Sequence, residues 1–188
     1  MTEEQKKTSP YSGYILIALA ALLMWLGGQL NNSISSAHHQ ILIAEAELKD
    51  SVFDETVILM LQHTTQSGLG LIVNKPGKGE FFNGGPVERD KKYYLLHSLD
   101  VVWPKSVIMK DMNLGVVEGG EDVKDLITED KKPGWYRLVN GYSGWGKRQL
   151  ARELGRGSWR IVRYDEKFVK ETPPAEMWQK ALKLPAVE

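Results

Sequence analysis

The sequence predicts a single α+β domain preceded by one membrane-spanning helix. Three observations support this fold class: an uncharged apolar run near the N-terminus, short apolar segments separated by turn residues, and only a few helical segments. Strands that follow one another with few crossover helices favour an α+β arrangement over a doubly wound parallel sheet. The residues after the apolar run are numerous enough to form one hydrophobic core.

The apolar run at residues 13–30 has about the length of a bilayer-spanning helix. It contains no charged residue, and at ~1.5 Å per residue its length approaches the ~30 Å hydrocarbon core. Lys6 and Lys7 precede the run, and no Lys or Arg follows before Lys49. The positive-inside rule therefore predicts a single-pass protein of the cytoplasmic (inner) membrane, with the N-terminus inside and the domain outside. Two alternatives remain open: a domain on the cytoplasmic side, and cleavage after Ala37 with release to the periplasm.

The predicted organisation has five parts along the chain. They are an N-terminal tail at 1–12, the transmembrane anchor or signal sequence at 13–30, a polar linker at 31–40, the α+β domain at 41–184 and a C-terminal tail at 185–188.

Strands and helices of the domain follow from its apolar segments and its turn residues. Two β-rich apolar segments, 56–62 and 68–74, flank a short turn and predict a buried hairpin. Acidic residues at a first turn, a glycine at a helix end (Gly155) and a proline at a first turn (Pro173) mark three helices. Further strands are expected at 93–97, 107–110, 135–141 and 159–164, and helices at 121–128, 145–154 and 173–182.

Composition excludes several kinds of chemistry. Lys plus Arg and Asp plus Glu each number 24, so the formal net charge is zero, and nucleic acid is an unlikely partner on charge grounds. The absence of Cys excludes disulfides, thiol nucleophiles and Cys-ligated metals. One local feature departs from neutrality: Arg148, Arg152 and Arg156 recur every four residues on one predicted helix face. This face could contact an anion or anionic lipid, or it could be a solvated surface balanced by the acidic segment 111–130.

A serine lies between a predicted strand and a predicted helix, where hydrolases place their nucleophile. The segment Gly141-Tyr142-Ser143-Gly144-Trp145 has Trp where the G-x-S-x-G motif requires Gly. Ser143 is therefore interpreted as a helix cap rather than a nucleophile. Free N–H groups at the start of this helix could still hold an anion.

A glycine-rich loop and two histidines complete the candidate residues. Gly84-Gly85-Pro86 lacks the Lys-Ser/Thr of a phosphate-binding loop, so a tight turn is favoured. His63 and His97 each end an apolar strand, and two histidines without suitably spaced acids do not make a metal site. No metal and no cofactor are predicted. His97 could act as a general base, or it could simply satisfy backbone groups at the strand end.

Several separated motifs resemble the YqgE/AlgH family. The similarity extends from Ile41 to Leu184, and its most specific motif is Gly141–Trp145 followed by Gln149, Leu150 and Glu153. The other motifs are Gly70–Pro76, Gly84–Val87, Leu96-His97, Trp159 and Trp178. The resemblance implies an α+β domain with a branched or barrel-like mixed sheet flanked by helices. It also implies a proposed role in transcriptional regulation, and it supplies no agreed catalytic residues. Family members are usually predicted to be cytosolic, and the N-terminal apolar run departs from that pattern.

The leading functional hypothesis is a non-enzymatic binding or regulatory domain with an unknown protein or small-molecule partner. Aromatic side chains would supply apolar contact area, and Asn74 and His97 polar contacts. The predicted site comprises Asn74, Gly84, Gly85, Pro86, His97, Tyr142, Ser143, Trp145 and Gln149. One alternative is a hydrolase-like enzyme using His97 with Ser143 or Tyr142, which requires these groups within about 2.6–3.2 Å of one another or one water apart. Another alternative is a transcriptional regulator, although no helix-turn-helix pattern is evident.

Overall fold

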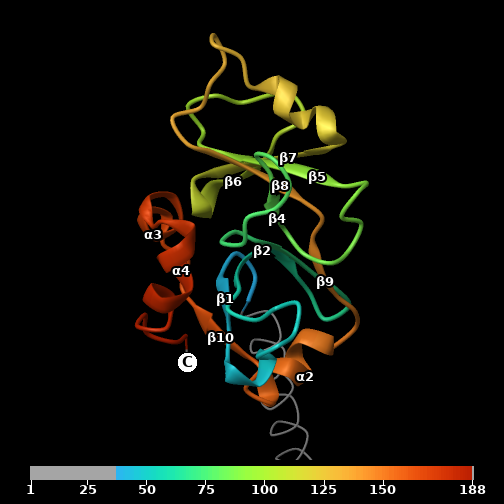
Figure 1. Cartoon of the computed structure of the whole chain (residues 1–188), viewed down its shortest axis with the longest axis vertical. Coiled ribbons are helices and arrows are strands. Elements are labelled where there is room, and N and C mark those ends of the chain that lie inside the picture. The colour runs from blue at the N-terminus through green and yellow to red at the C-terminus, as the bar shows by residue number, and fades with distance from the viewer. Residues whose placement is uncertain (1–36, 188) are drawn as a thin grey trace, which may run out of the picture.

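The computed structural model describes residues 37–187 and shows two β-sheets with helices around them (Figure 1). Sheet A has the strand order β10-β1-β2-β3-β9, and all its neighbouring strands are antiparallel. Its strands are β1 (Ile41–Ala44), β2 (Val57–His63), β3 (Gly68–Ile72), β9 (Ser143–Trp145) and β10 (Trp159–Val162). The predicted hairpin is formed by β2 and β3, with a register shift between Met60 and Gln62.

Sheet B has the order β4-β8-β5-β7-β6 and is mixed, because β4 pairs with β8 in parallel. Its strands are β4 (Phe82–Asn83), β5 (Tyr93–His97), β6 (Val107–Met109), β7 (Leu114–Gly119) and β8 (Tyr136–Asn140). The α-helices are α2 (Gln149–Gly155), α3 (Glu166–Glu171) and α4 (Pro174–Ala181), and the 3₁₀ helices are η1 (Ala46–Leu48), η2 (Lys110–Met112) and η3 (Glu121–Leu126).

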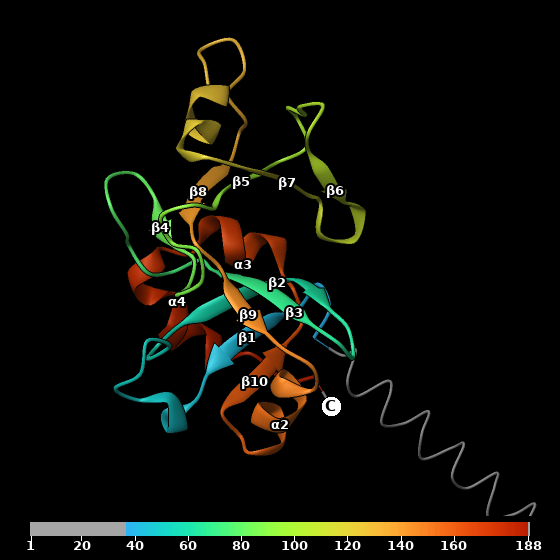
Figure 2. The same ribbon diagram turned by 90° about the vertical axis from the view of Figure 1, so that its right-hand side faces the viewer.

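Alternation along the strands places the core in three clusters. One cluster fills the space between the sheets and reaches α3 and α4, with Leu59, Leu96 and Val139 among its members. A second lies between sheet A and α2, and a third lies between sheet B and η3. Sheet A is therefore buried on both faces, which explains why its strands are almost continuously apolar. Figures 1 and 2 show α2 and η3 at opposite ends of this stack.

The α+β prediction is confirmed, but the barrel-like mixed sheet is wrong. The strands form two separate sheets whose edges are β10, β9, β4 and β6. A barrel requires its edge strands to pair with each other. Within the described residues the edge strands do not pair, and three of them are short: β9 has three residues, β4 has two and β6 has three. The chain instead passes from sheet B to sheet A at Gly141-Tyr142, between β8 and β9.

The membrane part of the prediction is corrected as well. Among residues 37–187, no helix is both long enough and apolar enough to cross a bilayer. The span predicted at 13–30, like the tail at 1–12, lies outside the described residues. The described residues therefore give no support to the membrane-anchored fold or to the single-pass inner-membrane location.

Local differences from the predicted elements have identifiable causes. The helix predicted from Trp145 begins only at Gln149, because Trp145 pairs with Gly68 in sheet A and Arg148 has a left-handed backbone (φ 56°). Strand β7 escapes prediction because Gly115 and Glu118 interrupt its apolar run. The segment predicted as a helix at 121–128 is the 3₁₀ helix η3.

Candidate functional site

The predicted site residues Gly84, Gly85, Tyr142 and Ser143 lie together where the two sheets meet. We call the contact between residues 83–87 and residues 140–143 the Gly84 junction. The Ile72 N–H donates to the Gly84 carbonyl at 2.9 Å, and the Gly84 N–H donates to the Asn140 carbonyl at 2.8 Å. Val87 and Tyr142 exchange two backbone hydrogen bonds of 3.0 Å. The junction joins strands of both sheets through backbone contacts.

Close backbone approach explains the glycines of this junction. A Cβ atom on Gly84 would lie 2.3 Å from the Gly141 carbonyl oxygen, and one on Gly85 would lie 2.3 Å from the Tyr142 carbonyl carbon. Such distances are far inside van der Waals contact. Gly85 also has a φ of 148°, which L-residues with side chains rarely adopt. Both glycines are therefore required by packing, and Pro86 follows them in the same loop.

Ser143 is fully buried in strand β9, and its hydroxyl donates to the Gly84 carbonyl at 3.2 Å. It neither caps α2, which starts six residues later, nor faces solvent as a nucleophile must. The helix-cap interpretation of Ser143 is wrong, and the hydroxyl serves the junction.

Asn74 is also occupied by internal hydrogen bonds. Its Oδ1 accepts from the Val57 N–H at 2.8 Å, and its Nδ2 donates to the Glu55 carbonyl at 2.9 Å. The side chain thereby supplies the hydrogen bonds that a neighbouring strand would otherwise give to the backbone at the start of β2. It contributes no free polar group to a surface site.

Trp145 and Gln149 belong to a third arrangement, which we call the Glu153 network. The Glu153 carboxylate accepts from both indole nitrogens, of Trp145 and Trp159, at 2.8 Å each, and from the Gln149 amide at 2.9 Å. The two indoles meet edge to face with ring centroids 5.9 Å apart. This network fixes α2 on sheet A, and the motif that contains Trp145 reflects this packing.

Arg148, Arg152 and Arg156 are all exposed, but only Arg152 lies within α2. Among residues 37–187, none of the three pairs with a carboxylate. The 3₁₀ helix η3, which carries part of the acidic segment 111–130, is at the opposite end of the molecule from α2 in both views (Figures 1 and 2), so it does not cover α2.

His97 is completely buried, with both ring nitrogens in hydrogen bonds. Nδ1 is 2.9 Å from the Ser98 carbonyl oxygen, and Nε2 is 2.9 Å from the Ser106 hydroxyl. The Ser98 carbonyl can only accept, so Nδ1 carries the proton, and Nε2 can accept from Ser106. A histidine so enclosed cannot act as the general base that the hydrolase alternative requires.

The role of His97 is to position Trp103. The two rings meet edge to face with centroids 4.9 Å apart, and the backbone N–H of Trp103 donates to the same Ser106 hydroxyl at 3.1 Å. The imidazole covers Gly115 so closely that a Cβ there would lie 2.2 Å from its Cε1 atom. The loop that carries Trp103 is thereby held on sheet B.

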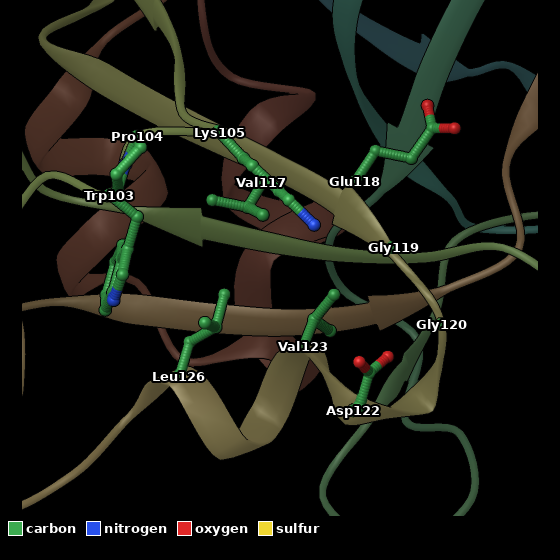
Figure 3. A pocket seen from close by; sticks show the side chains of 10 residues that line it. All are labelled: Trp103, Pro104, Lys105, Val117, Glu118, Gly119, Gly120, Asp122, Val123 and Leu126. Carbon is green, nitrogen blue, oxygen red and sulfur yellow. The ribbon is translucent and has the colours of Figure 1, made fainter.

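Beside this loop is a cavity of about 320 Å³, which we call the Trp103 cavity (Figure 3). Buried Trp103, Val117 and Val123 and half-buried Leu126 supply its apolar wall, and Val123 and Leu126 point from η3 toward the strands. Charged side chains stand at the mouth, including exposed Lys105 and Asp122. The complete lining is Trp103, Pro104, Lys105, Val117, Glu118, Gly119, Gly120, Asp122, Val123 and Leu126.

A concave, mostly apolar surface with a few charged groups is the form of most small-ligand sites. Sequence reasoning missed this cavity completely. The one signal in the sequence was the three-residue spacing of Val123 and Leu126, which places both apolar side chains on the same face of η3.

Comparison with known proteins supports the family. A model of the AlgH-like family (DUF179) matches residues 41–188. The chain belongs to the AlgH-like family. A UPF0301 protein from Cytophaga hutchinsonii is 34% identical over 167 residues, covering 77% of this chain and 87% of that protein. One from Idiomarina loihiensis is 29% identical over 170 residues, covering 79% and 90%.

Two solved structures share the fold. The solution structure of the AlgH protein from Pseudomonas aeruginosa has a TM-score of 0.65 at 22% identity and covers 96% of this chain and 94% of its own. A crystal structure of a Corynebacterium diphtheriae protein has a TM-score of 0.63 at 17% identity, covering 78% and 85%. At these identities the likeness shows the fold alone.

Proposed function

We propose that this AlgH-like domain is a non-enzymatic binding domain whose ligand occupies the Trp103 cavity. The cavity itself carries the proposal: about 320 Å³ lies at the lower end of the usual size of small-ligand sites. The ligand is therefore a small apolar or aromatic group, or an apolar side chain of a partner protein. The predicted site at Asn74, His97, Trp145 and Gln149 is replaced, because these side chains are engaged internally.

The construction of the wall supports binding by a preformed site. The Ser106 hydroxyl is bonded to the His97 ring and to the Trp103 backbone N–H, and the two rings are in contact, so this side of the cavity wall is held in place before a ligand binds. A preformed site loses less conformational entropy on binding. Lys105 and Asp122 at the mouth offer opposite charges for orienting a polar group of the ligand. Nucleic acid is not part of the proposal, since the formal net charge is zero.

The test uses the whole chain, labelled with ¹⁵N and with ¹³C at methyl groups, and three related probes. Indole, tryptamine and indole-3-acetate share one ring system and differ in charge. We expect a saturable shift of the Trp103 indole N–H and of the Val123 and Leu126 methyl resonances, with dissociation constants of about 1 mM or lower, as is usual for fragments of this size. Shifts scattered over the surface, or no saturable shift, would overturn the proposal.

A variant and a matched control localise the effect. Leu126→Glu places a carboxylate in the wall and should abolish the shifts, whereas Asp125→Ala changes an exposed neighbour on the same 3₁₀ helix and should not. The ¹⁵N spectrum of each variant shows whether η3 is retained. Equal binding by Leu126→Glu and the parent chain would place the probe elsewhere.

A further inference from the structure

Sheet B carries a buried cation on the face opposite to the Trp103 cavity. Arg137 lies in β8 and is only 8% exposed. Successive strand residues point to opposite faces. Leu138 belongs to the cluster beside η3, so Arg137 faces the space between the sheets, like Val139. This position is independent of the cavity assigned above.

The Arg137 guanidinium has an unusual set of partners. Its Nη1 donates to the Val73 carbonyl at 2.7 Å, and its central carbon is 4.9 Å from the Phe82 ring centroid and 5.4 Å from that of Trp135. No ion pair within residues 37–187 includes it. A guanidinium has five N–H donors, and a single carbonyl leaves most of them unused.

The unused donors reach the surface. The fully enclosed side-chain atoms that lack a partner in the described part of the chain are on His63, Asn140 and Tyr164, and none is an Arg137 nitrogen. The Arg137 nitrogens not bonded to Val73 therefore have solvent contact, although the residue as a whole is nine-tenths buried.

Charge around this arginine favours an anion. The Lys170 ammonium is 5.7 Å from the centroid of the same Trp135 ring, and Glu166 is its partner. The local sum of Arg137, Lys170 and Glu166 is thus one positive charge. Burial lowers the pKa of Arg137 to about 10, so it remains charged at neutral pH, and its charge lacks compensation.

A purely structural role explains these observations less well. Replacing buried charges by apolar groups of similar volume is often neutral or stabilising, so filling the core does not require a cation here. Aromatic faces attract guanidinium groups and hold the planar fork in one orientation. An oriented fork with free donors matches the two oxygens of a carboxylate or phosphate group.

We propose that Arg137, held between Phe82 and Trp135, binds a single carboxylate or phosphate group at the boundary between sheet B and α3. The group enters from the exposed side of the guanidinium and accepts the N–H groups that Val73 leaves free. Its negative charge offsets the one positive charge that remains from Arg137, Lys170 and Glu166.

The first test follows the side-chain Nε–H resonance of Arg137 in the full chain. Sodium phosphate and sodium acetate are titrated separately at constant ionic strength, with sodium chloride as the reference. Phosphate or acetate, or both, should give a saturable shift of this resonance and of the Trp135 indole N–H. The stronger of the two responses identifies the oxyanion. Equal shifts in chloride alone, or no saturable shift, would overturn the proposal.

The second test uses variants and thermal unfolding. Phosphate or acetate should raise the melting temperature of the parent chain and of Arg163→Met, a control that removes an exposed arginine just after β10. Arg137→Met should lose this rise and bind at least tenfold more weakly. An equal rise in Arg137→Met would overturn the proposal. If Arg137→Met fails to fold, the resonance titration of the parent chain decides alone.

Discussion

The Gly84 junction and the Trp103 cavity are built from different kinds of residue. The junction consists of backbone contacts, with glycines where no Cβ fits and a buried serine hydroxyl. The cavity consists of ordinary apolar side chains on a loop, a strand and a 3₁₀ helix. Two of the recognisable motifs, Gly84–Val87 and Gly141–Trp145, meet at the junction, whereas no residue that lines the cavity belongs to a motif. The motifs of the junction therefore mark where backbones touch, and the proposed binding surface lies elsewhere.

The largest effect is expected from Gly84→Ala. The added methyl would lie 2.3 Å from the Gly141 carbonyl oxygen and 2.4 Å from a Val139 methyl, and the backbone position of the Gly141 carbonyl limits relaxation. We expect the free energy of unfolding to fall by about 3 kcal/mol or more. Urea unfolding followed by circular dichroism measures it.

Gly155→Ala is the matched control, because no atom lies within 4 Å of the new methyl position. Alanine at this helix end should be neutral or stabilise the chain by up to about 1 kcal/mol. If Gly84→Ala costs no more than this control, the junction is not the tight contact described here.

Glu153→Ala should have the next largest effect. The substitution leaves the indole N–H groups of Trp145 and Trp159 without their acceptor, beside a buried core. Unsatisfied buried donors cost about 1–3 kcal/mol each, less where water can enter, so we expect a loss of about 2–3 kcal/mol in urea unfolding. Glu176→Ala, which removes an exposed partner of Lys180, should cost less than about 0.5 kcal/mol. Equal losses in the two variants would contradict the network.

The sequence predicts best where one physical factor dominates. Apolar continuity gives β2 and β3 correctly, because both faces of sheet A are buried. It fails at β7, where Gly115 makes room for the His97 ring, and at Trp145, which starts no helix because it pairs with Gly68. Of the predicted site residues, Gly84, Gly85, Tyr142 and Ser143 do come together. The Trp103 cavity could not be predicted, because Trp103, Val117 and Val123 become neighbours only through the pairing of sheet B and the return of η3.

Acid should weaken a contact that joins the start of the described chain to β2 of sheet A. The His38 Nδ1 atom accepts from the backbone N–H of His63 at 3.3 Å, and the rings of His38 and His39 stack with their centroids 3.8 Å apart. Burial lowers the pKa of both His38 and His63 below the ordinary 6.5, with the neighbouring histidine a smaller cause. The unfolded chain therefore binds more protons than the folded one near that pH.

The sign follows directly: the stabilisation is complete above about pH 6.5 and is lost as the pH falls below it. Urea unfolding at pH 7.5, 6.5 and 5.5 should show a decreasing free energy. The double variant His38→Gln with His63→Gln keeps side-chain acceptors but does not titrate, so its stability should depend less on pH over this interval. Parallel pH dependence in the two chains would show that other groups are responsible.

The smallest effect on stability, and the sharpest contrast with the junction, is expected at the mouth of the cavity. Lys105 is exposed and lines the opening, so Lys105→Glu should change the free energy of unfolding by less than about 0.5 kcal/mol. It should nevertheless alter ligand preference, because the charge at the mouth is reversed. Binding of indole-3-acetate should weaken and binding of tryptamine should strengthen, each by about two- to fivefold, the range of exposed ion pairs.

Arg148→Glu makes the same change of charge at the far end of the molecule and separates a local effect from a general one. Equal responses of the two variants would mean that probe binding depends only on net charge. That result would contradict the proposal that the Trp103 cavity is the binding site. A response confined to Lys105→Glu would show that the Trp103 cavity, whose lining contains none of the motifs, carries the recognition.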